Sequence, residues 1–230
     1  MSSVLTQGMM EDEAGEAAQT GNLVHSAAAE YHRTGNIEEA LKALDADRAK
    51  FPDGDPKKAI KIFTNYSADP RNQGVTCLAV EKHVELVLAP APDDPSGLPI
   101  HIEGTLDQVR VRNEKNILAD IKTGYRLNAQ ETVAEYLVQQ ACYWLAAEQT
   151  LGITIHEAEL IHTPAYEKNR GNPFLPTKLT KNSVLVLLSG VVSLVSLIRK
   201  GHPIFRPGDP CDYCPLKNYD NCYHFARGIL

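Results

Sequence analysis

Two aspartates and a lysine stand where they could hold a divalent cation. If the chain turns tightly at Asn113 and Glu114, the flanking segments form a hairpin in which Asp107 lies directly across from Asp120. Lys122 follows two residues later, so its side chain points to the same face. Like charges placed opposite each other destabilise a hairpin, and a divalent cation flanked by a lysine would offset that repulsion.

Such a group suits phosphate chemistry. Carboxylate oxygens with open coordination positions favour Mg²⁺ or Mn²⁺. The ion would polarise a phosphodiester oxygen and lower the pKa of a bound water, while Lys122 could orient that water or stabilise the developing charge. Taken alone, the hairpin fits a surface turn with solvated charges equally well.

Hydrophobic periodicity predicts the elements that position these residues. Helices are expected at 21–50 with a break at 34–36, at 56–66, at 131–149 and at 183–198. Strands are expected at 75–88, 100–112, 116–122 and 153–162. This order predicts one α/β domain with a mixed sheet.

The composition of the 230 residues, with 43% hydrophobic and 23% charged, is that of a globular protein. A net charge of −6 argues against a small basic module that coats nucleic acid without selectivity. The first residues lack the regions of a secretory signal, which predicts a cytoplasmic protein. The run 183–198 is apolar apart from a serine stripe and a glycine, which predicts a mostly buried amphipathic helix rather than a membrane span.

Three of the five cysteines, Cys211, Cys214 and Cys222, crowd near the C-terminus. An odd count with a Cys-x-x-Cys pair and no export signal points to metal ligation in a reducing compartment. Thiolates at this spacing converge on one centre, which is either an iron–sulfur cluster or a zinc ion that His224 completes.

The order of the motifs resembles the PD-(D/E)XK nuclease superfamily, and within it the RecB-like exonuclease branch, which includes CRISPR-associated adaptation nucleases and phage exonucleases. The motifs that carry the resemblance are Gly21-xxx-His25, Gly104-xx-Asp107, Asp120-x-Lys122, Gln139-xxx-Tyr143 and the three C-terminal cysteines. The chain departs from the family pattern in having Leu106 in place of proline, aspartate in place of glutamate at 120, and no cysteine before Gly21.

The resemblance implies a restriction-endonuclease-like fold, a mixed central β-sheet flanked by helices, with a C-terminal metal-binding segment. Its expected divisions are a disordered or incomplete leader at 1–19, a nuclease domain at 20–205 and a cysteine-rich segment at 206–230.

The resemblance also assigns roles to residues. It implies that Asp107, Asp120 and Lys122 are catalytic, and that His25, as a neutral imidazole, and the Ile121 carbonyl complete the metal site. Gln139 and Tyr143 would contact the phosphate backbone or brace the site. Glu81 stands where relatives often carry an acid, although an exposed strand residue is an equal alternative. The cysteines would hold a [4Fe–4S] cluster, with Zn²⁺ as the alternative.

The function expected from the resemblance is that of a Mg²⁺- or Mn²⁺-dependent deoxyribonuclease, an exonuclease more than an endonuclease, acting on DNA ends or single strands. The expected setting is DNA recombination, repair, phage replication or spacer acquisition, in a prokaryote or phage, with a possible recombination or CRISPR adaptation partner protein. The basic loop at 168–181 could follow a single strand electrostatically. The alternative is a non-catalytic, metal-stapled DNA-binding or assembly subunit.

Overall fold

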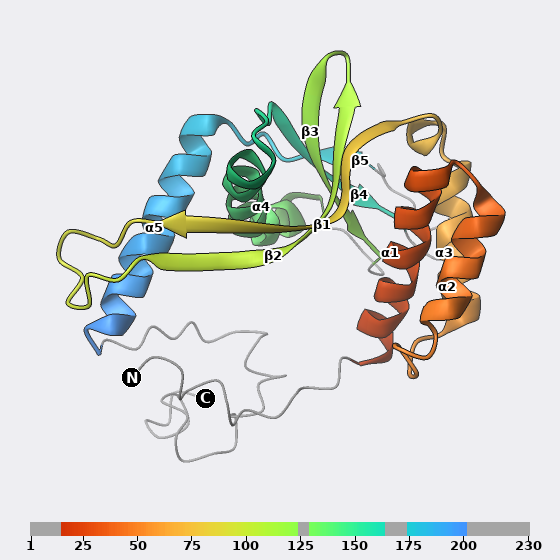
Figure 1. The fold of residues 1–230 in the computed structure, drawn as a ribbon, viewed down its shortest axis with the longest axis horizontal. Helices are drawn as coiled ribbons and strands as arrows, with labels where there is room; N and C mark the ends of the chain where they lie inside the picture. The colour runs from red at the N-terminus through yellow and green to blue at the C-terminus, as the bar shows by residue number, and fades with distance from the viewer. Residues whose placement is uncertain (1–14, 124–128, 164–173, 202–230) are drawn as a thin grey trace. The chain divides into compact units, whose positions relative to one another are not determined.

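The computed structural model describes residues 15–123, 129–163 and 174–201 (Figure 1). In these ranges the elements follow the order expected from the sequence, with one further strand. They are α1 (Glu16–Thr34), α2 (Ile37–Asp47), α3 (Pro56–Ala68), a short 3₁₀ helix η1 (Pro70–Asn72), β1 (Thr76–Leu88), β2 (Ile100–Arg112), β3 (Lys115–Lys122), α4 (Ala129–Leu151), β4 (Glu157–His162), β5 (Phe174–Pro176) and α5 (Lys181–Arg199).

The five strands form one mixed sheet in the order β1-β2-β3-β4-β5. The pairs β2–β3 and β4–β5 are antiparallel, whereas β3 and β4 are parallel. The connection between the two parallel strands contains α4, as parallel pairing requires a long crossover. The expected mixed sheet flanked by helices is therefore confirmed.

The hairpin of β2 and β3 has the predicted register. Arg112 pairs with Lys115, and the ladder runs up to Gln108 and Ala119. Asn113 and Glu114 have φ of 51° and 62°, the left-handed values that a two-residue type I′ turn requires. This turn fixes which residues of the two strands lie opposite each other.

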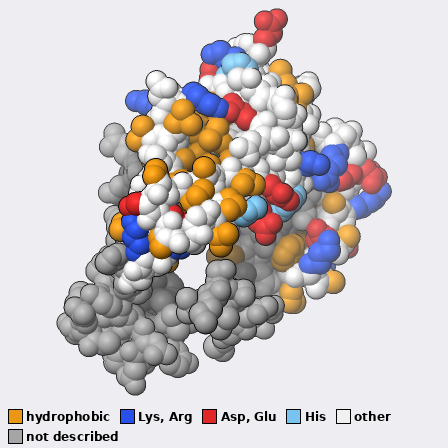
Figure 2. Space-filling model, turned by 60° about the vertical axis from the view of Figure 1, so that its left-hand side comes forward, with side chains coloured by type: hydrophobic (Ala, Val, Ile, Leu, Met, Phe, Trp, Pro, Cys, Tyr) orange, Lys and Arg blue, Asp and Glu red, His pale blue; other side chains and the backbone are white. Residues whose placement is uncertain are grey.

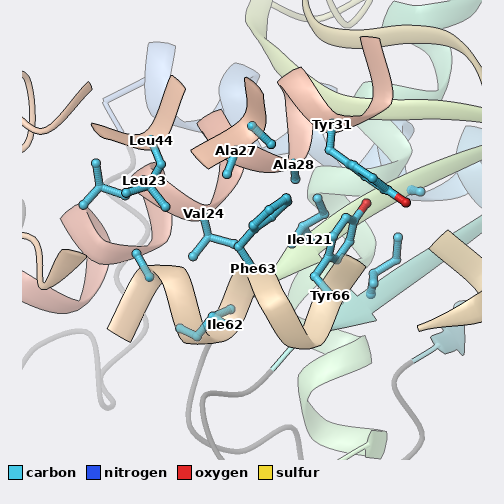
Figure 3. Close-up of a cluster of buried hydrophobic side chains, with 14 residues drawn as sticks. Leu23, Val24, Ala27, Ala28, Tyr31, Leu44, Ile62, Phe63, Tyr66 and Ile121 are labelled. Atoms are coloured by element: carbon cyan, nitrogen blue, oxygen red, sulfur yellow. The ribbon is translucent and has the colours of Figure 1, made fainter. Parts of the chain in front are cut away.

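The two faces of the sheet carry different helices. The side chains of Ala119 and Ile121 in β3 belong to a buried cluster with α1 and α3, in which Phe63 is the largest fully buried member besides Tyr66 (Figure 3). Because side chains alternate along a strand, Asp120 and Lys122 point to the other face, where α4 brings Tyr136 close to Lys122. Asp120 and Lys122 thus lie on the face that carries α4.

Helix α1 begins at Glu16, four residues before the expected start of the domain at residue 20. The reason is a set of contacts to the loop before α3. The side chain of Gln19 accepts from the Asp53 N–H at 2.9 Å, and the Thr20 hydroxyl accepts from the Asp55 N–H at 2.9 Å. Residues at the end of the expected leader therefore anchor α1.

The described residues form two compact units, one within 15–86 and 102–185, and the other within 87–101 and 186–201. Within the second unit, the end of α5 holds the loop between β1 and β2. Arg199 donates to the Asp94 carboxylate at 2.9 Å and to the Leu98 carbonyl at 2.7 Å. Lys200 pairs with Asp93 in the same loop.

The expectation that α5 is mostly buried is wrong. Only 17% of its most apolar stretch is buried, because large apolar side chains lie on its open side together with Ser189 and Ser193, whereas Ser196 of the stripe is buried. Val186 is 69% exposed and Ile198 54%. Hydrophobic side chains open to solvent are visible on the face shown in Figure 2. With a mean hydropathy of 1.9, α5 is long and apolar enough to cross a membrane by length and composition alone.

Candidate active site

Six elements of the first unit, α1, α2, β1, β2, β3 and α4, line one cleft of about 1020 Å³. The cleft contains the expected site residues that the structure describes. They are His25, Glu81, Asp107, Asp120, Ile121, Lys122, Gln139 and Tyr143. Residues that lie far apart in the sequence are thus brought together.

The imidazole of His25 lies between two carboxylates. Its Nδ1 is 3.2 Å from an Asp107 oxygen and 3.5 Å from a Glu81 oxygen. Burial alone would lower the pKa of His25, but Asp107 and then Glu81 outweigh burial and raise this pKa to about 10. In the absence of another cation, the imidazolium therefore offsets part of the negative charge of the two acids.

The Asp107 carboxylate is fixed by the backbone of the next strand. Its Oδ2 accepts a hydrogen bond from the Ile121 N–H at 2.6 Å. The carboxylate thus continues the contact between β2 and β3 beyond the last ladder pair, Gln108 and Ala119. Because one oxygen is engaged, the other, Oδ1, is presented to His25.

Asp120 forms the second carboxylate of the hairpin face. Burial, together with the nearby charge of Asp107, raises the pKa of Asp120 to about 6, although Lys122 opposes this shift. The Lys122 ammonium lies 3.1 Å from Oδ1 and 2.8 Å from Oδ2 of Asp120. Ionised Asp120 is therefore costly in the metal-free protein.

Glu81 reaches the site through an unusual backbone conformation. Its φ of 44° lies in the left-handed region, inside strand β1, where a residue other than glycine costs about 1–3 kcal/mol. A left-handed residue inside a strand changes the direction of its side chain relative to plain alternation. The structure brings Glu81 to His25, so its alternative interpretation as a plain exposed strand residue does not describe its surroundings.

Two glycines allow the close approaches on which the cleft depends. A Cβ at Gly21 would lie 3.0 Å from the Thr123 hydroxyl oxygen, so glycine lets α1 approach the end of β3. A Cβ at Gly104 would lie 2.9 Å from the Tyr143 ring, so glycine lets that ring lie against β2. Steric crowding therefore explains why two of the sequence motifs have glycine at these positions.

The donor set suits a divalent cation. One atom each of His25, Glu81 and Asp107 lies within 4.8 Å of the others, and Asp120 adds a fourth group to the same cleft. Three carboxylates with one imidazole match the oxygen-rich coordination of Mg²⁺ or Mn²⁺. A cation would relieve the repulsion that raises the pKa of Asp120.

Sequence reasoning missed Tyr136. Its ring centroid lies 4.1 Å from the Lys122 ammonium, and Tyr136 also lines the cleft. The sequence contains a signal for this residue. Tyr136 stands three residues before Gln139 and seven before Tyr143, a spacing that places all three on one face of a helix.

Other expected site residues are not placed by the structure. Cys211, Cys214, Cys222 and His224 lie outside the described residues, as do Lys168 and Arg170 of the basic loop. Lys181 of that loop pairs with Glu148 of α4.

The fold and the cleft define a class of α/β proteins in which two adjacent strands carry aspartates and a lysine beside a histidine and a glutamate that could hold a metal ion. The sequence profile of the PD-(D/E)XK nuclease superfamily matches residues 4–219, and the chain belongs to this superfamily.

Two solved structures are similar to this chain. A candidate exonuclease from Eubacterium rectale has a TM-score of 0.54 at 13% identity, with 91% of this chain and 83% of that chain covered. The crystal structure of SSO0001 has a TM-score of 0.44 at 16% identity, with 87% and 83% covered. Among curated proteins, none matches. At these identities, the first of the two structures supports the fold alone.

The surroundings of His25 lead to a prediction about metal choice. If His25 is a ligand, His25→Ala weakens Mn²⁺ binding more than Mg²⁺ binding, because imidazole suits the softer ion. Isothermal titration of the purified variant with each ion measures the difference. Equal losses for the two ions would show that His25 supports the acids without binding the metal.

Proposed function

We propose that this protein is a metal-dependent deoxyribonuclease that hydrolyses phosphodiester bonds at DNA ends or in single strands. The observation that carries the proposal is the meeting of Asp107, Asp120 and Lys122 with His25 and Glu81 in one cleft of a superfamily member. A purely structural surface hairpin would not need two carboxylates at one imidazole and a third carboxylate in the same cleft.

The side chains have separable roles in this proposal. Asp107, Asp120, Glu81 and His25 hold Mg²⁺ or Mn²⁺, and the Ile121 carbonyl is a further proposed ligand. When bound, the ion polarises the phosphodiester and lowers the pKa of a coordinated water. Lys122 orients the nucleophile and stabilises the charge that develops on the phosphate oxygens.

Helix α4 supplies the proposed contact to the substrate. Gln139 is exposed and lines the cleft, and Tyr143 is seated one turn away on the same face. An amide and a phenol can each donate to a phosphate oxygen without reading base identity. Such contacts suit an enzyme that acts on many sequences.

The preference for ends rests on the motif order and agrees with the E. rectale protein being a candidate exonuclease. The proposed setting is DNA recombination, repair, phage replication or spacer acquisition. A partner protein from recombination or CRISPR adaptation would then deliver the DNA end.

The test uses matched linear and circular DNA. Purified protein is incubated with single-stranded and duplex forms of each, labelled at either end where possible, with Mg²⁺, Mn²⁺ or EDTA. We expect digestion of linear DNA with either ion and none with EDTA, and an RNA of the same sequence to be spared. Binding without cleavage under all conditions would favour the alternative of a non-catalytic DNA-binding or assembly subunit.

We further propose that Cys211, Cys214 and Cys222 hold a [4Fe–4S] cluster, with Zn²⁺ and His224 as the rival arrangement. These residues lie outside the described ranges, and support comes from the thiolate donor set and its spacing.

Metal analysis with visible absorption on anaerobically purified protein separates the two arrangements. Iron with sulfide and a visible absorption band is the expected result, and replacing any of the three cysteines by serine should remove it and lower thermal stability, because bound metal contributes folding free energy. One zinc per chain without iron would establish the rival arrangement, and neither metal would exclude the site.

A further inference from the structure

The ammonium of Lys122 has two neighbouring groups. The Asp120 carboxylate has its oxygens 2.8 and 3.1 Å from Nζ. The Tyr136 ring has its centroid 4.1 Å from Nζ. A lysine ammonium ends a flexible four-carbon stem, so contacts at its tip decide where the charge lies.

The two contacts respond differently to a bound cation. Under the proposed function, the ion and the ammonium share one carboxylate, Asp120. The charge that this carboxylate gives to the ion is no longer available to Lys122, and the two positive charges repel each other. The face of an aromatic ring attracts an ammonium without carrying a formal charge, so a divalent cation in the acidic group does not compete for it in the same way.

The fold presents the Tyr136 ring on a firmly held helix. Further along α4, Trp144 is 2% exposed, and the Gln140 side chain donates to the Glu159 carbonyl at 3.2 Å. These contacts fix the side of α4 that faces the sheet. The position of the Tyr136 side chain follows from that orientation, because Tyr136 lies on the same cleft-facing side of α4 as Tyr143.

We propose that Tyr136 is a positioning residue, whose ring holds the Lys122 ammonium at the cleft once a cation has engaged Asp120. The catalytic consequence of this inference rests on the proposed function, whereas the contact between Tyr136 and Lys122 does not. Tyr136 acts through Lys122 and is not assigned a contact with the substrate.

Loss of the Tyr136 ring should lower kcat rather than raise KM. Tyr136→Leu keeps an apolar side chain but removes the aromatic face, so kcat for linear DNA should fall about tenfold while KM stays within about twofold. Tyr136→Phe restores the face and should restore kcat. Val138→Ala on the same helix is the control, since Val138 is 43% exposed and does not line the cleft.

A spectroscopic measurement tests the contact without any cleavage. The lysines of the full chain are converted to ¹³C-dimethyl-lysine, and the Lys122 resonance is identified by its absence in Lys122→Arg. In the wild type this resonance should lie upfield of the others, because the methyl groups sit over the ring, and it should stay there when Mg²⁺ is added. Tyr136→Leu should abolish the upfield shift, and Tyr136→Phe should keep it.

The outcomes are distinct. A resonance that does not move in Tyr136→Leu overturns the contact. A resonance that moves while kcat stays at the wild-type value overturns the positioning role. If wild-type protein cleaves no DNA, the proposed function fails, and the resonance with Mg²⁺ present still decides whether the ring holds Lys122.

Discussion

Replacing Asp120 by asparagine should abolish cleavage and at the same time stabilise the metal-free protein. Loss of a metal-binding carboxylate removes the ion that the chemistry needs, so we expect a fall of about 10³-fold or more in kcat/KM. The buried, ionised Asp120 costs free energy in the metal-free fold, since its pKa is raised to about 6 by burial and by Asp107. A neutral amide of the same size avoids that cost.

The sign of the stability change follows from proton linkage. Between the ordinary pKa of 3.8 and the raised value near 6, the folded protein binds more protons at Asp120 than the unfolded chain does. Stability contributed by this proton is present at low pH and is lost as the pH rises through about 6. At pH 7.5 the wild type therefore carries the full cost, and Asp120→Asn should have the higher Tm in EDTA.

The measurement pairs nuclease rates with thermal unfolding in EDTA and in Mg²⁺. Asp45→Asn is the control, because the Asp45 side chain is 73% exposed on α2 and lies outside the site cleft. Mg²⁺ should raise the Tm of the wild type and of the control, but not that of Asp120→Asn. Near-wild-type cleavage by Asp120→Asn would contradict the proposed mechanism.

Lys122→Ala separates binding from chemistry. This variant should also lose cleavage, by about 10²- to 10³-fold, because the charge that stabilises the transition state is gone. It should keep or strengthen metal binding, since Asp120 no longer shares its charge with an ammonium. Parallel loss of metal affinity would mean that Lys122 supports the fold of the site and not the reaction.

The hairpin was predictable because its determinants are local. A two-residue turn and strict alternation of side chains fix the register, so Asp107, Asp120 and Lys122 could be placed on one face from sequence. The break between α1 and α2 was equally local: Gly35 takes the left-handed φ of 69°, and Asn36 caps the next helix.

The features that were missed depend on tertiary context. Strand β5 has only three residues and is defined by its pairing with β4. No local sequence pattern predicts that pairing. Strand β4 begins at Glu157 rather than 153, because only from there does β3 lie beside it. The exposure of α5 was misjudged because its serine stripe was taken to mark its only open side.

A buried polar network behind the hairpin of β2 and β3 was also not predicted. On the face opposite Asp120, the Tyr66 hydroxyl accepts from Arg110 at 2.6 Å and from Gln108 at 3.0 Å. Burial and the charge of Arg110 lower the pKa of His32 to about 4, so this imidazole is neutral, and its Nε2 shares a hydrogen bond of 2.6 Å with the Tyr66 hydroxyl. In the sequence, Arg110 resembles any strand arginine that points to solvent.

Arg110 carries the positive charge of that network into the core. Its side chain is 3% exposed and lies 4.0 Å from the equally buried Glu159, on the strand beyond β3. Its Nε donates to Gln108 at 2.7 Å, directly beside Asp107 in the chain. The network therefore ties α1 and α3 to the strand that bears Asp107.

Arg110→Met should destabilise the protein by about 3 kcal/mol or more. The variant takes the buried Arg110 charge away from Glu159, and it removes the hydrogen bonds that Arg110 donates to Tyr66 and Gln108. Arg112→Met is a matched control: the same acid lies 3.0 Å away, but this arginine is 47% exposed, so we expect about 1 kcal/mol or less. Urea unfolding at pH 7.5 measures both. Equal losses would show that burial does not set the value of these pairs. A larger loss for Arg112→Met would show that Arg112, and not Arg110, neutralises Glu159.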